Sequence, residues 1–136
     1  MPQPDQSALH ASASRGLAAF VAGWLLPGLG HALLRRWTRA AVFFASVVAL
    51  AAAGVWLRGN IFTRQAADPF EWLGFLADAG TGVLYPAVLY LNRQWHIVAD
   101  VSRAAGDYGT RFFAAAGALN LLCAFDAYAI GTGRKA

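Results

Sequence analysis

The sequence predicts an all-α, polytopic membrane protein with four transmembrane helices arranged as two hairpins. Hydrophobic residues make up 58% of the 136-residue chain and charged residues 13%, whereas soluble domains are roughly 45–50% apolar and about 25% charged. The apolar residues fall in long runs, and a short cluster of arginines separates the first two runs. A soluble protein this apolar lacks the polar side chains to cover its core, so we expect a lipid bilayer to be its solvent.

The net charge of +4 raises the question of nucleic-acid binding. However, the basic residues lie in short clusters at the ends of apolar runs, which is where membrane proteins keep them. No basic stripe with interleaved aromatic residues is present, so the sequence disfavours a nucleic-acid partner. The one cysteine, Cys123, lies in an apolar run and has no second cysteine to pair with.

The chain divides into a tail and one domain. Residues 1–14 are rich in Pro, Gln, Ser and Ala without apolar periodicity, and we expect a disordered N-terminal tail there. Residues 15–136 then form a single helical membrane domain. A cleaved signal peptide is the alternative for the apolar run after Arg15, but this run continues past Pro27 and no Ala-x-Ala site follows it. We therefore expect a retained helix.

The first span is predicted over residues 16–34, long enough at about 1.5 Å per residue to cross most of a ~30 Å hydrocarbon core. Pro27 removes a backbone donor and crowds the preceding turn, so the helix should kink or stop there. Gly28 and Gly30 have no side chains and allow another helix to approach the break. We interpret the break as structural, with a substrate or ion site at broken-helix backbone as the alternative.

Four basic residues follow this break. His31 and Arg35 are four residues apart and share one helix face, which we expect to point at the membrane interface. Arg35, Arg36 and Arg39 are predicted to contact lipid phosphate, worth about 1 kcal/mol each near an anionic surface. A specific ligand site is the less favoured interpretation.

The second span is predicted over residues 40–57. It contains a stripe of alanines at four-residue spacing, which places small side chains along one helix face. Such stripes allow helix backbones to pack closely in lipid, so we expect this face to be a packing surface. The stripe consists of Ala41, Ala45, Ala49 and Ala53.

The third span is predicted over residues 69–91. Asp68 has the properties of an N-cap, with Pro69 at the first helical position and Glu71 completing a capping-box-like arrangement. Asp78 then lies about two turns inside the span, at membrane depth. An intramembrane carboxylate is a functional candidate, but we favour a structural role, either protonated or paired with an arginine of the preceding loop (Arg58 or Arg64).

Residues 92–111 are too polar to span a membrane, and an amphipathic pattern lies within them at residues 94–107. His96, Asp100, Arg103 and Asp107 follow one another at helical spacing and form a polar stripe, with apolar residues between them. The pattern predicts a short interfacial amphipathic helix before the last span.

The last span is predicted over residues 112–130. Asn120 shares a face with Ala116, Ala124 and Ala127, so it is expected to make an interhelical hydrogen bond. Asp126 lies near the end of this span and is the third polar side chain at membrane depth, after Asp78 and Asn120.

Four spans fix which residues share a membrane face. One face should carry His31, Arg35, Arg36, Asp107 and Arg111, and the opposite face Arg58, Asp78, Asp126 and Arg134. Contact between His31 and Asp126 would therefore mean that one predicted span does not cross. Lysine and arginine are almost evenly divided between the two sides, so the positive-inside rule does not fix the orientation.

Two stretches carry a family resemblance. Residues 24–31 (WLLPGLGH) followed by Arg35 and Arg36, and residues 117–122 (GALNLL) leading into Asp126-Ala127-Tyr128, resemble an uncharacterised family of small bacterial integral membrane proteins. That family is itself similar to the TM-two domain, a helical hairpin with a glycine-rich, basic turn. This chain departs from the TM-two pattern by having Ala32-Leu33-Leu34 where an aromatic turn is usual. The resemblance implies a multi-pass protein of the bacterial inner membrane and no known activity.

The sequence indicates a structural or accessory role, in which the helices pack with themselves as a homo-oligomer or with a larger membrane complex. The alternative is a small transporter or channel subunit that uses Asp78, Asn120 and Asp126. A haem- or pigment-binding subunit rests only on isolated histidines, His31 or His96. No catalytic residue set, metal site or cofactor motif is recognisable, so we predict neither an enzyme nor a cofactor protein.

Overall fold

The computed structural model describes residues 6–65, 67–100 and 102–135, and regular structure in these residues is entirely helical. The helices are α1 (Gln6–Leu25), α2 (Leu29–Leu33), α3 (Trp37–Trp56), α4 (Pro69–Ala79), α5 (Leu84–Gln94) and α6 (Ala104–Gly131). By length and composition, α3 and α6 can cross a membrane, and α4 with α5 can form a third span only as a pair bent by 103°. The described residues therefore support two or three spans, and the predicted four are not confirmed.

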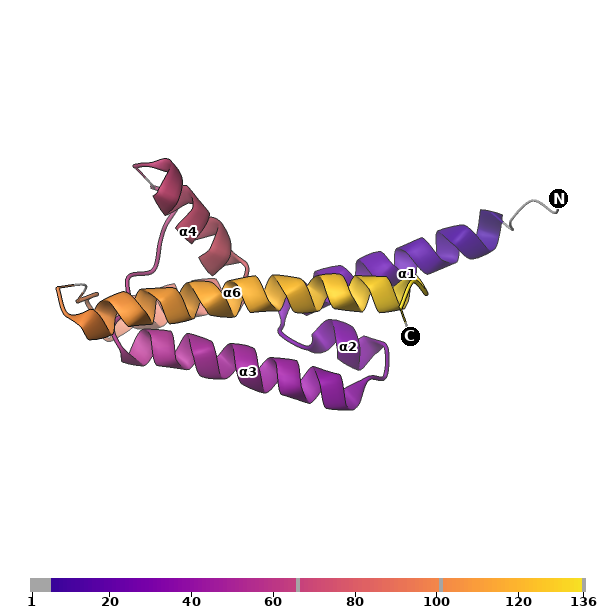
Figure 1. The fold of residues 1–136 in the computed structure, drawn as a ribbon, viewed down its shortest axis with the longest axis horizontal. Helices are drawn as coiled ribbons and strands as arrows, with labels where there is room; N and C mark the ends of the chain where they lie inside the picture. Colours follow the sequence, from indigo (N-terminus) through magenta and orange to yellow (C-terminus); the bar gives the residue numbers. More distant parts are fainter. Residues whose placement is uncertain (1–5, 66, 101, 136) are drawn as a thin grey trace.

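Helix α6 is the central element of the fold and runs along most of the molecule (Figure 1). Its buried positions recur every three or four residues, the spacing of one helix face. Most of these positions are small, which lets other backbones approach: a Cβ added to Gly109 would lie 2.8 Å from the carbonyl oxygen of Gly54 on α3. The buried residues of α6 are Gly106, Gly109, Phe113, Ala116, Gly117, Asn120, Cys123, Ala124, Ala127 and Gly131.

Helix α3 packs along α6 through a face different from the predicted alanine stripe. Val47 and Ala51 form the core cluster with Phe113 and Ala116 of α6, and Ala40 and Gly54 are also buried. The alanine stripe lies on another face of α3: Ala41, Ala45 and Ala49 are exposed and Ala53 is half-buried. The stripe thus does not pack within the described chain, because the face beside it brings Gly54 against Gly109 and Val47 into the core.

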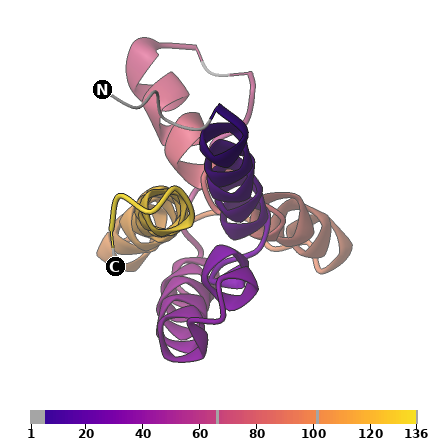
Figure 2. The same ribbon diagram turned by 90° about the vertical axis from the view of Figure 1, so that its right-hand side faces the viewer.

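The first predicted span is not one crossing helix. Helix α1 ends at Leu25, and Gly28 adopts a left-handed conformation with φ of 78°, so the chain reverses and α2 lies between α1 and α3 (Figure 2). The reversal is tight, since a Cβ on Gly30 would lie 2.2 Å from the carbonyl oxygen of Ala19. It returns His31 toward the end of the molecule from which α1 came.

This reversal overturns the predicted division of polar residues between two faces. His31 Nε2 lies 3.0 Å from Asp126 Oδ2, although the two side chains were expected on opposite sides of the membrane. The α2–α3 turn and the C-terminal end of α6 lie at the same end of the molecule (Figure 1). The sequence indicates a break at Pro27 but not that the chain turns back there.

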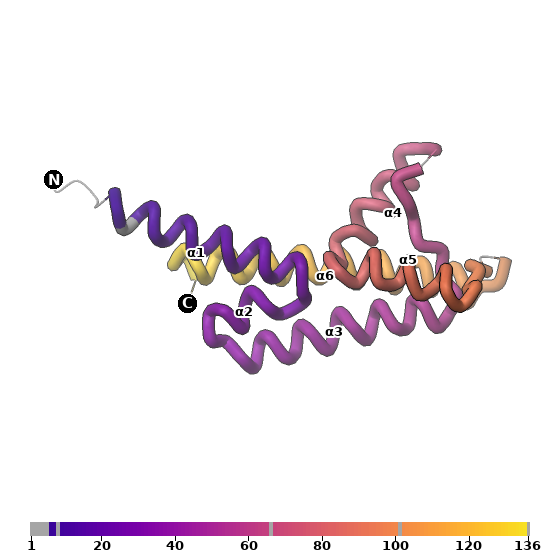
Figure 3. The backbone as a smooth tube through the Cα atoms, turned by 180° about the vertical axis from the view of Figure 1, so that it is seen from behind, coloured from indigo at the N-terminus to yellow at the C-terminus, as the bar shows by residue number. Residues whose placement is uncertain are grey.

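The third predicted span is also bent, at residues 80–83. Gly82 has φ of 66°, and a Cβ there would lie 2.0 Å from the carbonyl oxygen of Trp24 in α1. Helix α4 projects from the bundle (Figure 1), and α5 begins where α1 ends (Figure 3). The Val83 backbone N–H donates a hydrogen bond of 2.9 Å to the Leu25 carbonyl, so α1 and α5 follow one another along α6.

Two further boundaries differ from prediction. Helix α1 begins at Gln6, so residues 6–14 are helical rather than disordered, and residues 1–5 lie outside the described residues. Among the described residues of 94–107, the predicted separate interfacial helix is not found: α5 ends at Gln94, His96 has φ of 50°, and residues 104–107 are the first turn of α6. In place of that helix, the Asp100 N–H donates to the Arg58 carbonyl and joins two loops.

Candidate functional site

Asn120 lies where both helix breaks meet. The Nδ2 group of this side chain, which is completely buried, donates to the Trp24 carbonyl at the end of α1 and to the Gly80 carbonyl after α4, each at 2.9 Å. The sequence predicts one interhelical hydrogen bond at Asn120, and the structure contains two. Carbonyls at helix ends lack intrahelical partners, so one amide satisfies two ends at once.

The backbones at this junction are in close contact. A Cβ on Gly117 of α6 would lie 1.7 Å from the Ala77 carbonyl oxygen, and one on Gly80 would lie 2.7 Å from the Gly117 oxygen. The Trp24 indole N–H donates to the Ala79 carbonyl at 3.3 Å. We call Trp24, Leu25, Gly80, Val83 and Asn120 the break junction.

The chemistry available at the break junction is hydrogen bonding to backbone carbonyls. The C-terminal ends of α1 and α4, which carry partial negative charge, converge on a neutral amide donor. The Oδ1 atom of Asn120 is buried and has no hydrogen-bond partner among the described residues. The junction therefore holds two helix ends together and leaves one acceptor unused.

Asp126 lies in a second polar cluster, at the end of the molecule where α2 meets α6. Its Oδ2 atom accepts from His31 Nε2 at 3.0 Å and lies 3.6 Å from Arg39 Nη1, and its Oδ1 atom accepts from Lys135 Nζ. His31 is buried, and its ring lies 4.8 Å from the ring of Phe43. One carboxylate thus joins α2, α3, α6 and the residues after α6.

The predicted interface residues separate into two groups. Arg35 and Arg36 are exposed at the α2–α3 turn, as expected for residues that contact lipid headgroups. His31 does not face the interface, because the chain reversal turns its side chain into the bundle. Arg39 pairs with Asp126, a role that the sequence did not indicate.

Asp78 lies in a third polar site, between α4 and the loop before it. The side chain is completely buried, and its Oδ2 atom accepts from the Phe62 N–H at 2.8 Å. The Tyr85 hydroxyl donates to the Phe62 carbonyl at 2.9 Å, so both backbone groups of Phe62 are held. No ion pair joins Asp78 to Arg58 or Arg64 among the described residues, and Oδ1 has no partner there.

Three residues that form hydrogen bonds in these polar sites, Lys135, Tyr85 and Thr81, were not predicted from the sequence. Lys135 follows Asp126 by nine residues in a polar tail, and Tyr85 lies 23 residues after its partner Phe62, with α4 between them. Thr81 is buried and donates to the Asp78 carbonyl at 2.6 Å. Across the described residues, no group of three or more His, Cys, Asp or Glu side chains is arranged to hold a metal ion.

These features define an all-helical protein in which two helix breaks are joined on one long apolar helix. The chain belongs to a family of unknown function, DUF6677, whose model matches residues 18–136. The membership agrees with the expected uncharacterised family, whereas the expected similarity to the TM-two domain is not shown. Neither the curated proteins nor the solved structures contain a significant match to this chain.

Proposed function

We propose that this chain is a small integral membrane protein with a structural or accessory role and no catalytic activity. It would reside in the bacterial inner membrane as a multi-pass protein and pack with itself or with a larger membrane complex. One observation carries the proposal: the completely buried Asn120 amide is used to tie the Trp24 and Gly80 carbonyls together. Asp78 and Asp126 likewise hold groups of this same chain.

The outer surface supports a membrane location. Large apolar side chains are exposed on α1, α3, α4 and α6, where water would make their exposure costly and lipid would not. Helix α4 is the clearest example, because it projects from the bundle with a mostly apolar surface. Its exposed large residues are Phe70, Trp72, Leu73 and Leu76.

The proposal is tested by substituting the three polar residues and measuring stability and flux together. Asp78→Asn, Asn120→Ala and Asp126→Asn should each lower the unfolding temperature of the full chain in detergent. Proteoliposomes containing the wild type should show no proton or ion flux above protein-free liposomes. Membrane residence is checked separately by resistance to alkaline carbonate extraction, which releases peripheral proteins.

The second candidate is a small transporter or channel subunit. One observation favours it: carbonyl ends of two broken helices meet in the middle of the bundle, an arrangement that transporters use to bind ions and substrates. Under this alternative, wild-type proteoliposomes conduct, and Asn120→Ala abolishes flux in a protein that still folds. That result would replace the structural proposal.

The accessory role also requires a companion. Gentle detergent extraction followed by crosslinking should yield either a defined homo-oligomer or a reproducible complex with another membrane protein. A monomer that is fully stable alone, at every detergent concentration, would contradict the accessory role while leaving the membrane location intact.

A further inference from the structure

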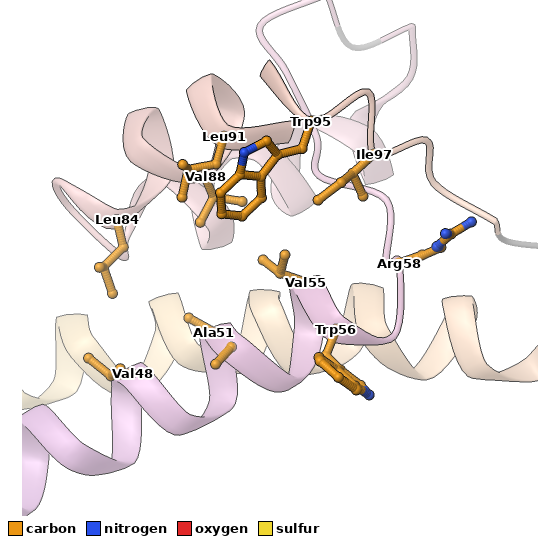
Figure 4. Close-up of a pocket in the computed structure, with 11 residues that line it drawn as sticks. Val48, Ala51, Val55, Trp56, Arg58, Leu84, Val88, Leu91, Trp95 and Ile97 are labelled. Carbon is orange, nitrogen blue, oxygen red and sulfur yellow. The ribbon is translucent and has the colours of Figure 1, made fainter. Parts of the chain in front are cut away.

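An apolar groove of about 520 Å³ runs between α3 and α5. Figure 4 shows Leu84, Val88 and Leu91 of α5 on one wall, with Val48, Ala51 and Val55 of α3 on the other. The groove is open because α5 packs loosely: none of its residues is buried, and only some of its side chains reach the core cluster.

One end of this groove carries positive charge. Arg58 lies at that end, and an adjoining pocket of about 330 Å³ shares Trp56 and Arg58 with the groove. The adjoining pocket also contains Arg103 and Asp100, whose Nε and Oδ2 atoms lie 3.2 Å apart. Asp100 therefore offsets the charge of Arg103, and Arg58 forms no ion pair with the described residues. The groove is therefore apolar along its length, and the adjoining pocket at its Arg58 end is polar, with two arginines and one aspartate.

The backbone holds Arg58 at this place in an unfavourable conformation. Its φ of 56° is left-handed, at the position after a helix end where glycine is usual. Gly59 follows it directly, and this glycine is needed elsewhere, because its Cβ would lie 2.2 Å from the Gly109 carbonyl carbon. The Asp100 N–H fixes the Arg58 carbonyl at 3.0 Å. A side chain kept at the cost of backbone strain is a reason to look for a ligand.

We propose that the groove binds an acyl chain of an anionic membrane lipid, with the headgroup phosphate at Arg58. The apolar walls suit the acyl chain, and the Arg58 guanidinium, which pairs with no carboxylate of the described residues, complements the phosphate, to which arginine can donate two hydrogen bonds. Trp95 lies over the groove beside Val88, and Ile97 lies between it and Arg58 (Figure 4). The site rests on the proposed membrane location and adds a specific ligand to it.

The contribution of the Arg58 charge to lipid binding is tested by native mass spectrometry of the full chain in an uncharged detergent. The probes are phosphatidylglycerol and phosphatidylcholine with identical acyl chains. We expect retention of one phosphatidylglycerol per chain, preferred over phosphatidylcholine by about fivefold, the effect of one cation near an anionic headgroup. Arg58→Gln should remove the preference, and Arg64→Gln, in an exposed loop outside both cavities, should keep it.

The groove itself is tested by filling it. Ala52 lines the groove from α3 and is exposed, so Ala52→Trp should reduce retention of both lipids without unfolding the protein. The matched control is Ala45→Trp, an exposed alanine of the same helix that does not line the groove. It should retain lipid like the wild type.

Three results would overturn the lipid site. The first is an unchanged phosphatidylglycerol preference in Arg58→Gln, and the second is equal lipid retention in Ala52→Trp and the wild type. The third is a stoichiometric dimer that Ala52→Trp dissociates, which would assign the groove to a second copy of this chain. Each result leaves membrane residence intact, because carbonate extraction measures that property independently.

Discussion

The single side chain of Asn120 donates two buried hydrogen bonds between helices. It satisfies carbonyls from two helices that are 56 residues apart at Trp24 and Gly80, while occupying a position that alanine could fill sterically. Interhelical hydrogen bonds of this kind contribute about 0.6–2 kcal/mol in membrane proteins. A residue with two such bonds should therefore matter more than its neighbours on the same face.

Asn120→Ala is expected to lower the free energy of unfolding by about 1–3 kcal/mol, because two buried carbonyls lose their donor. The measurement is reversible unfolding of the full chain in mixed detergent micelles, followed by circular dichroism. Asn60→Ala is the matched control, since the half-buried Asn60 side chain makes no hydrogen bond to the described residues. Equal losses in the two variants would argue that Asn120 contributes no more than its volume.

The contacts of Asp126 predict a large coupling free energy between Asp126 and His31. His31 is completely buried, and its Nε2 atom lies 3.0 Å from a carboxylate whose side chain is 19% exposed. A double-mutant cycle with His31→Ala and Asp126→Ala should give a coupling free energy of about 1–3 kcal/mol, in the upper part of the range of about 0.5–3 kcal/mol for contacting residues in one network.

The chain offers an internal reference for that cycle. Asp107 and Arg111 lie 2.7 Å apart on the surface of α6, with side chains 54% and 69% exposed. Their coupling should be about 0.3–0.5 kcal/mol, as measured for exposed helical pairs. A His31–Asp126 coupling no larger than this would show that the cluster does not hold α2 against α6.

At the scale of elements, each helix break has a glycine with left-handed backbone, Gly28 in the first and Gly82 in the second, and Gly133 after α6 has the same backbone conformation. Gly82 and Gly133 both have positive φ, of 66° and 74°, but their surroundings differ. A Cβ on Gly82 would lie 2.0 Å from the Trp24 carbonyl oxygen, and one on Gly133 would meet nothing within 4 Å. Comparing an added Cβ at Gly82 with one at Gly133 therefore separates the cost of the left-handed backbone from the cost of close approach to another helix.

Gly133→Ala should lower the free energy of unfolding by about 1–2 kcal/mol, the cost of a left-handed residue with a Cβ. Gly82→Ala carries the same strain and must also move α5 away from α1, so we expect at least about 2 kcal/mol beyond the Gly133→Ala value. Thermal unfolding of both variants in one detergent provides the comparison. If the two losses were equal, the contact between the breaks would be unimportant for stability.

Elements whose signals are local were predictable from sequence. Asp68 caps α4 as expected, accepting from the Glu71 N–H at 2.8 Å, with Pro69 at the start of the helix. The apolar runs of α3 and α6 also correspond to helices long enough to cross a membrane. In each case the residues that decide the structure are close in sequence.

The candidate site was predictable only in part. Asn120 and Asp126 stood out as polar residues in an apolar run, but their partners did not. One partner of each lies 95 or more residues away, Trp24 for Asn120 and His31 for Asp126. The reversal at Gly28 depends on the close approach of its backbone to Ala40, a contact that no local pattern records. The polar stripe over residues 94–107 had helical spacing. The structure instead has a hydrogen bond from the Asp100 N–H to the Arg58 carbonyl, a partner far away in the sequence.

At the scale of the whole molecule, the reversal between α1 and α2 and the bend between α4 and α5 change which loops lie at the same end of the molecule. Helices α3 and α6 run along the bundle in opposite directions. Helix α1 runs inward from one end, and α2 returns toward that same end. The α2–α3 turn and the C-terminal end of α6 consequently lie at one end, and the loop before α6 lies at the other (Figure 1). Four separate crossings would instead place the α2–α3 turn with the loop before α6.

Single cysteines at three positions distinguish these arrangements: Thr38 in the first turn of α3, Ser102 before α6 and Arg134 after it. They are introduced into a Cys123→Ala background, and a membrane-impermeant maleimide is applied to intact cells and to inverted membrane vesicles. With α3 and α6 as the crossings of the proposed membrane protein, Thr38→Cys and Arg134→Cys should react from one side and Ser102→Cys from the other. Reaction of Thr38→Cys and Ser102→Cys from the same side, opposite Arg134→Cys, would restore the four-span topology. The contact between His31 and Asp126 would then have no place in the membrane-embedded protein.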